Sequence, residues 1–179
     1  MTGYLKYLPR PLLDDIISNS CIPIIGAGFS KNADLPRGKN MPEWDELGHA
    51  FAEEMTDYTY TNSLDSISAY SYEFSRPKLV EKLIEFLHVM DCKPSSVHES
   101  FCRIPFDLVC TTNFDFLLEK GYEKIGKYHR PIIEEDQLTI GTRGFRLNGS
   151  EQKVNLLKLH GDIHHPNRLV VTEQDYDSF

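Results

Sequence analysis

Short apolar runs alternate with longer stretches of helical spacing along this chain. Three runs have the composition of buried strands: residues 21–25 (CIPII), 106–112 (FDLVCTT) and 154–159 (VNLLKL). A weaker extended run lies at 128–133, and RLVV (168–171) is expected to form a further strand. Strands that alternate with helical stretches are typical of parallel sheets. The pattern therefore predicts an α/β, Rossmann-like fold with a mainly parallel sheet.

Most of the chain between the first two strong strand runs has the spacing of amphipathic helices. Residues 42–103 contain several helical pieces, one of which opens after Met41 and another at Pro77. We therefore expect a helix-rich insertion after the first strand, within a single domain that spans residues 1–179.

Shorter helices are expected elsewhere. Residues 9–20 have helical apolar spacing, and TEQDYDSF (172–179) has the pattern of a capped helix. A further helix follows the second strand run, where Asn113 or Asp115 offers a capping side chain. Residues 141–150 are predicted to form a turn or hairpin.

Composition and charge exclude several classes of protein. The chain has 27 acidic and 19 basic residues, a net charge of -8 and no lysine- or arginine-rich run, which disfavours direct binding of nucleic acid. The absence of a long apolar stretch or a signal-peptide core favours a cytoplasmic protein without a membrane span.

Neither the cysteines nor the histidines have the spacing of a metal site. The four cysteines are scattered, with no C-x-x-C pair, and are expected to be small buried hydrophobes. The cluster of His160, His164 and His165 lacks a matching carboxylate pattern. We predict no metal and no zinc.

Polar clusters follow each of the three strong strand runs. They are GAGFS (26–30), TTNFD (111–115) and LHGD (159–162). In open parallel sheets ligands bind outside the carboxyl ends of the strands, so the three clusters are expected to converge on one site.

The first cluster is a glycine turn of a kind that brings backbone N–H groups close to phosphate oxygens. A tight turn without any ligand is an equally good explanation of Gly26-Ala27-Gly28 taken alone. Lys31 occupies the place of the third glycine in the dehydrogenase motif, so a dehydrogenase is not supported. Lys39 is not followed by the hydroxyl residue of a nucleotide-hydrolase phosphate loop, so a nucleotide hydrolase is not supported either.

The other two clusters also have structural explanations. Asn113 and Asp115 are good helix caps, and His160 is explained equally well as a core histidine. Their shared position favours chemistry on a nicotinamide riboside. Nicotinamide is cationic in NAD and leaves as a neutral molecule, so no general acid is required. A histidine with a pKa near about 6.5 can serve as a base, and an asparagine amide can orient ribose or water.

These residues resemble the motifs of the sirtuins. Residues 26–30 followed by ADLP (33–36) are similar to the Gly-Ala-Gly-x-Ser opening of that family and its Leu-Pro. TNFD (112–115) resembles its Gln-Asn-x-Asp stretch, and His160-Gly161 resembles its catalytic His-Gly.

The resemblance implies a function for each matching residue. Asn113 and His160 would be catalytic, with Asn113 at the ribose and nicotinamide and His160 as the base. Asp115 would contact the carboxamide, and Ala27, Gly28 and Ser30 would bind the NAD phosphates. The remaining residues implied in cofactor binding are Gly26, Leu35, Pro36, Thr112 and Gly161.

The differences from the sirtuin motifs narrow the range of expected functions. Sirtuin deacylases carry a zinc ribbon of paired C-x-x-C motifs after His-Gly, and residues 160–176 contain no cysteine. The variant motifs look most like bacterial sirtuin-like NADases of anti-phage defence, which deplete NAD+. The family continues into a later strand, so residues 1–179 are expected to be incomplete at the C-terminus.

Three functions follow from these observations. NAD+ hydrolysis to nicotinamide and ADP-ribose is expected, with NAD+ as substrate and with activation by homo-oligomerisation or by a sensor partner. An NAD-dependent protein deacylase is the second candidate, and a catalytically inactive module that senses NAD or ADP-ribose is the third.

Overall fold

A four-stranded parallel sheet organises the computed structural model, which describes residues 5–133 and 153–178. The strand order is β1-β2-β4-β3, and all three neighbouring pairs run parallel. The strands are β1 (Ile24–Ile25), β2 (Leu108–Thr111), β3 (His129–Ile132) and β4 (Val154–Lys158). The predicted α/β fold with a parallel sheet is confirmed. The turn expected at 141–150 lies outside the described residues.

Helices make up most of the chain between β1 and β2, as the apolar spacing predicts. This part contains α2 (Ala27–Ser30), α3 (Trp44–Glu53), α4 (Ser63–Phe74), α5 (Arg76–Phe86) and α6 (Ser96–Cys102). The remaining helical elements are η1 (Leu5–Tyr7), α1 (Arg10–Ile17), α7 (Leu117–Lys124), η3 (Pro166–Arg168) and α8 (Glu173–Asp177). A helix-rich segment therefore does follow the first strand.

One apolar core lies between the sheet and the helices α1, α6 and α7. Val109 of β2 and Leu156 of β4 are fully buried there, together with Tyr122 of α7 and Cys102 of α6. Ile16 of α1 packs against the same cluster. Burial of each large apolar side chain contributes about 1.5–3 kcal/mol, so this core stabilises β2 and β4 against the helices.

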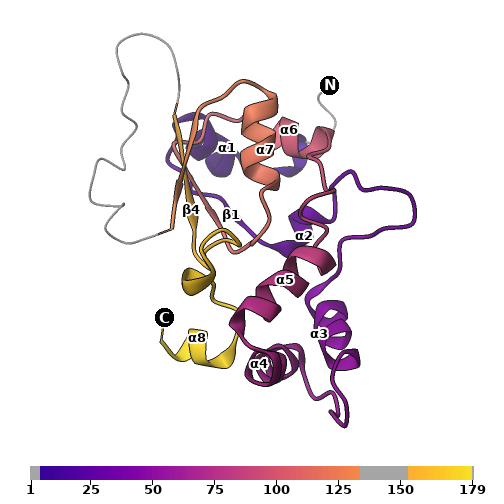
Figure 1. The fold of residues 1–179 in the computed structure, drawn as a ribbon. Coiled ribbons are helices and arrows are strands. Elements are labelled where there is room, and N and C mark those ends of the chain that lie inside the picture. Colours follow the sequence, from indigo (N-terminus) through magenta and orange to yellow (C-terminus); the bar gives the residue numbers. More distant parts are fainter. Residues whose placement is uncertain (1–4, 134–152, 179) are drawn as a thin grey trace.

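A second core joins the helices of the insertion to the segment after β4. It contains Phe51 of α3, Ile67 of α4 and Leu79 of α5, together with Leu169 and Val171. In Figure 1 the helices α3, α4, α5 and α8 lie together below the sheet, whereas α1, α6 and α7 lie around its upper part. The two groups meet beyond the carboxyl ends of the strands.

The first strand differs from the prediction of a buried strand. Only Ile24 and Ile25 of the 21–25 run form β1, which pairs with β2 on one side, and no described strand pairs with its other side. Ile22 and Ile24 are consequently 56% and 71% exposed. An apolar run indicates a strand, but whether both of its faces are covered depends on neighbours that are distant in sequence.

The extended run predicted at 168–171 is also wrong as a strand. Arg168 ends η3, and the following residues have no regular structure although Leu169, Val170 and Val171 are buried. Their backbone groups are satisfied by other partners, because Val170 N–H donates to the His160 carbonyl and Arg76 donates to the Leu169 carbonyl. A buried apolar run can thus be irregular when loops and side chains meet its hydrogen bonds.

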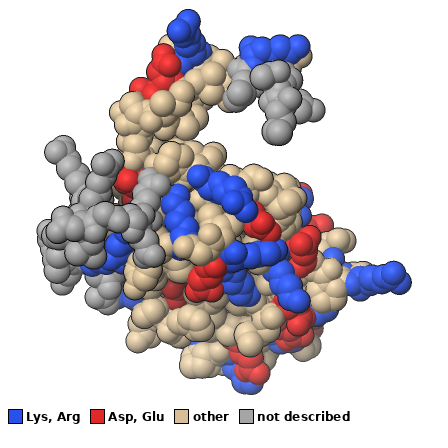
Figure 2. Space-filling model, turned by 90° about the horizontal axis from the view of Figure 1, so that it is seen from above, with Lys and Arg blue, Asp and Glu red and all other residues tan. Residues whose placement is uncertain are grey.

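Surface charge is mixed on the face that carries α6 and α7. Lysine and arginine side chains lie there among acidic ones and form no continuous basic stripe (Figure 2). Lys124 and Arg103, for example, both pair with Glu99. No helix in the two described ranges has the length and apolar character needed to cross a membrane.

Candidate active site

A cavity of about 320 Å³ opens where β2 and β4 end. All three polar clusters contribute to its wall. Ala27 and Ser30 come from the glycine turn and α2, the segment 112–115 follows β2, and His160 follows β4. The structure thus brings Ala27, Ser30, Thr112, Asn113, Asp115 and His160 together around one space.

The other predicted binding residues do not line this cavity. They are Gly26, Gly28, Leu35, Pro36 and Gly161. Gly26 contributes through its carbonyl, which accepts a hydrogen bond from Asn113. Leu35 lines a second cavity of about 560 Å³, and Met41 belongs to the walls of both cavities.

Gly161 is required by the backbone. Its φ of +69° is in the left-handed region, and a Cβ on this residue would lie 2.3 Å from the Arg168 carbonyl oxygen. The glycine therefore lets the chain turn sharply after His160 and pack against the segment after η3.

Hydrogen bonds fix the orientation of Asn113, a residue that is 8% exposed. Its Nδ2 donates to the Gly26 carbonyl at 3.1 Å and to Ser30 Oγ at 2.9 Å. Because a carbonyl only accepts, the amide nitrogen must face Gly26, and both of its hydrogens are used. Oδ1 is then the atom of this amide that can accept a hydrogen bond from a ligand in the cavity.

Asp115 both satisfies a donor at the start of α7 and lines the cavity. Its Oδ1 accepts from Leu117 N–H at 3.0 Å, which satisfies one donor at the start of α7, as the capping interpretation requires. Its Oδ2 accepts from Ser30 Oγ at 2.5 Å. Ser30 therefore connects the carboxylate of Asp115 to the amide of Asn113. Asn113 itself does not cap α7, whose N-cap is Phe116.

His160 is half-buried between two aromatic side chains. The ring centroids of His160 and Tyr176 are 5.5 Å apart at 87°, and those of His160 and Phe114 are 6.3 Å apart at 31°. Burial lowers the pKa of His160 below its ordinary value of 6.5. The imidazole is therefore mainly neutral at pH 7, the state in which it can accept a proton.

Several residues of the wall were not predicted from the sequence. They are Met41, Pro42, Glu43, Trp44, Leu47, Leu87, Phe114 and Tyr176. Most come from the helical insertion, where the amphipathic spacing gives no sign of a ligand site. Trp44 and Tyr176 remain 39% and 43% exposed, and an aromatic side chain left partly exposed beside a polar cluster is a signal for a ligand site.

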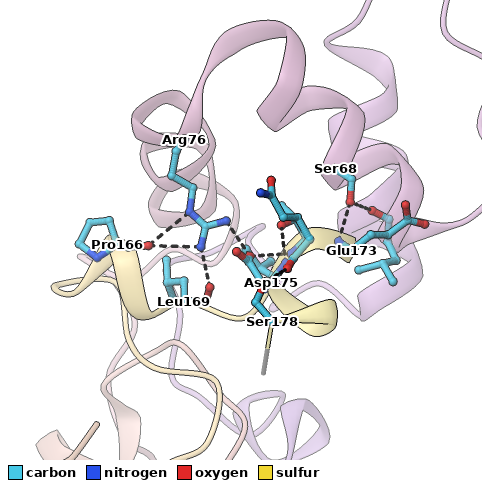
Figure 3. Close-up of polar contacts among 11 residues, drawn as sticks. Ser68, Arg76, Pro166, Leu169, Glu173, Asp175 and Ser178 are labelled. Carbon is cyan, nitrogen blue, oxygen red and sulfur yellow. Dashed lines mark hydrogen bonds and ion pairs between the residues drawn. The ribbon is translucent and has the colours of Figure 1, made fainter. Parts of the chain in front are cut away.

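The insertion also holds the helix that carries Tyr176 (Figure 3). Arg76, at the start of α5, donates to the carbonyls of Pro166 and Leu169 and to the Asp175 carboxylate. Ser68 of α4 accepts from Glu173 N–H at 2.9 Å. These contacts anchor α8 to α4 and α5, and so set the position of one wall of the cavity.

The described residues hold no group of three or more histidine, cysteine or acidic side chains suited to a metal ion. His165 Nδ1 instead pairs with Asp162 Oδ1 at 2.9 Å. All four cysteines are free, and Cys92, Cys102 and Cys110 are buried, as expected for small hydrophobic residues.

Comparison with known proteins identifies related sequences. A family model described as a SIR2-like domain matches residues 107–179. The chain is 25% identical over 177 residues to the NAD(+) hydrolase ThsA of Acinetobacter baumannii, an alignment that covers 97% of this chain and 34% of the relative.

Two further relatives have the same name. Identity to the NAD(+) hydrolase ThsA of Bacillus cereus is 24% over 184 residues, covering 100% of this chain and 36% of the relative. Identity to the NAD(+) hydrolase ThsA of Cytobacillus dafuensis is 23% over 154 residues, covering 86% of this chain and 30% of the relative. This chain thus spans about a third of the length of these relatives. The sirtuin resemblance carried by the motifs is confirmed, because the SIR2-like family model matches the part of the chain that contains β2, Asn113 and His160.

Proposed function

We propose that this chain is the catalytic part of an NAD+ hydrolase that cleaves the nicotinamide–ribose bond to give nicotinamide and ADP-ribose. One observation carries the proposal. Asn113 and His160, from the ends of adjacent strands, line the same cavity as Ala27 and Ser30 of the glycine turn. The names of the three relatives agree with it.

The proposed reaction needs no acid for the leaving group. The electron pair of the C–N bond moves to the pyridinium nitrogen, so nicotinamide departs neutral. Water adds to the anomeric carbon and gives up one proton to His160, which later releases it to solvent. Burial favours this task because it lowers the pKa of His160 and keeps the ring neutral at pH 7.

The remaining assignments follow the hydrogen-bond pattern. Asn113 Oδ1 accepts from the attacking water or a ribose hydroxyl, since Nδ2 is already committed to Gly26 and Ser30. The Asp115 carboxylate has lone pairs left after accepting from Ser30 and Leu117, and we assign it to the NH2 of the carboxamide. We assign the turn around Ala27 and Gly28 to the phosphates.

The biological role is a further part of the proposal. The likeness to bacterial defence NADases supports an effector that depletes cytoplasmic NAD+ during phage infection. Depletion of a general cofactor must be controlled, so we propose activation through self-association or through a sensor partner.

A turnover experiment tests the proposal. Protein is incubated with NAD+, with and without an acetyl-lysine peptide, and the products are identified by mass spectrometry. We expect nicotinamide and ADP-ribose in equal amounts without peptide. His160→Ala and Asn113→Ala should each lower the rate about 100-fold or more, the range for loss of a base or an orienting group.

Matched controls distinguish the site from general damage. His164→Ala and Asn32→Ala remove the same side-chain types at exposed positions and should retain the rate. Turnover that requires the peptide would indicate a deacylase instead. Undiminished turnover in both His160→Ala and Asn113→Ala would exclude this cavity as the active site.

A further inference from the structure

Lys158 is the last residue of β4, and its side chain is completely buried, with an exposed fraction of 0%. Removal of an ammonium group from water costs several kcal/mol unless nearby groups compensate. A completely buried lysine is therefore unusual unless it is paired. The groups around Nζ indicate the role of Lys158.

Two hydrogen bonds hold the ammonium group. Nζ donates to the main-chain carbonyl of Asp115 at 3.0 Å and to Glu119 Oε1 of α7 at 2.7 Å. Asp162 Oδ2 is 3.9 Å away, and the ring of Phe116 lies beneath Nζ with its centroid at 4.6 Å. The ammonium is thus compensated from the segments that follow both β2 and β4.

These partners connect Lys158 to both proposed catalytic residues. Lys158 precedes His160 by two positions in the chain. Asp115, whose carbonyl it binds, accepts from Ser30, and Ser30 accepts from Asn113. Lys158 itself is absent from the wall of the cavity, so it acts on the site only through these partners.

Stability alone does not explain an ion pair at this place. Replacement of a buried pair by well-packed apolar residues of similar volume is often neutral or stabilising. What an apolar pair cannot provide is a directional bond from the end of β4 to the main chain of Asp115.

We propose that Lys158 is a positioning residue, whose buried ammonium sets the separation of Asn113 and His160 by holding the Asp115 carbonyl against the end of β4. The inference rests on the proposed NAD+ hydrolysis for its effect on rate. Its structural part is independent of that activity.

The test replaces the ion pair of Lys158 and Glu119 by apolar residues that should leave the fold intact. In Lys158→Met combined with Glu119→Met, both charges are lost and the volumes are retained, so the melting temperature should stay within a few degrees of the wild type. We expect kcat for NAD+ to fall about 10- to 100-fold, with a smaller change in KM, because the reacting groups are misaligned while the cavity persists. Glu119→Gln is the control, since Lys158 keeps its bond to Asp115, and it should retain kcat.

Amide hydrogen exchange provides a readout without turnover. The N–H of Asn113 donates to Thr111 Oγ1, and that of Leu117 donates to Asp115 Oδ1. In the double methionine variant, exchange at these two amides should accelerate about tenfold or more, whereas Val109 and Leu156 in the strands should be unchanged.

A stable double variant with wild-type kcat and wild-type exchange at Asn113 and Leu117 would overturn the inference. If the methionine pair does not fold, Lys158→Gln with Glu119→Gln keeps a polar pair whose shorter side chain cannot reach Asp115, and the same losses are expected. A wild-type protein without NAD+ turnover would contradict the proposed function, and the exchange data would still decide whether Lys158 holds the Asp115 segment.

Discussion

Tyr176 of α8 lies edge-on to His160, with the two ring centroids 5.5 Å apart and the ring planes at 87°. The residues are 16 positions apart in the chain. Their contact depends on the helical insertion, because Arg76 and Ser68 hold α8 in place. The insertion therefore influences the surroundings of the proposed base through the ring of Tyr176.

Removal of the Tyr176 ring should change the pH dependence of NAD+ hydrolysis. Burial lowers the pKa of His160, so its neutral form is lost only as the pH falls below the ordinary value of 6.5. Tyr176→Ala admits water, raises this pKa toward 6.5 and moves the acid limb of kcat/KM to higher pH. Profiles between about pH 5 and 8 measure the shift. Tyr176→Phe keeps the ring and should keep the profile; an unmoved limb in Tyr176→Ala would contradict the role of the ring.

Ser30 should matter for both the rate and the stability. Its hydroxyl, 3% exposed, accepts from Asn113 and donates to Asp115, so Ser30→Ala frees the Asn113 amide to rotate. We expect a stability loss of about 1–3 kcal/mol, measured by urea unfolding, and a fall in kcat of about tenfold or more. Ser66→Ala is the control: Ser66 is equally buried and donates to the Gly48 carbonyl in the helical core, so its loss should affect stability alone.

Gly161→Ala should disrupt the segment after His160. The new Cβ combines a φ of +69° with a 2.3 Å approach to the Arg168 carbonyl, whereas at Gly126 (φ +68°) the space is open. Gly126→Ala should therefore cost about 1 kcal/mol from backbone strain, and Gly161→Ala about 2 kcal/mol or more. Thermal unfolding compares the two, and equal losses would show that the Arg168 contact is unimportant.

Loss of Arg76 should release α8 from α4 and α5. Its side chain is 24% exposed and makes bonds to Pro166, Leu169 and Asp175, so Arg76→Met should lower stability by about 2–4 kcal/mol. Limited proteolysis should then cut near α8 faster than in the wild type. Arg103→Met, at an exposed position, is the control. Unchanged cleavage in Arg76→Met would show that α8 is held by other contacts.

The local pattern of apolar residues predicted the parallel sheet and the convergence of the polar clusters at one edge of it. The apolar runs around Val109 and Leu156 form β2 and β4 because both are buried on the core side. Since parallel strands end at one edge, Asn113 and His160 had to emerge close together.

Long-range packing accounts for what the sequence did not predict. Tyr176 and Trp44 reach the cavity only because the insertion folds over the strand ends. The exposure of Ile24 depends on which strands flank β1, and the irregular course after Arg168 depends on Arg76, which is distant in sequence. None of these contacts leaves a local periodic signal.

The most direct test of the shared site is a crystal structure of His160→Ala with NAD+ bound. We predict density for the nicotinamide riboside in the cavity between Asn113 and position 160, with Asn113 Oδ1 within hydrogen-bond distance of a ribose hydroxyl or an ordered water. NAD+ bound outside this cavity, or with its nicotinamide end remote from Asn113, would contradict the account.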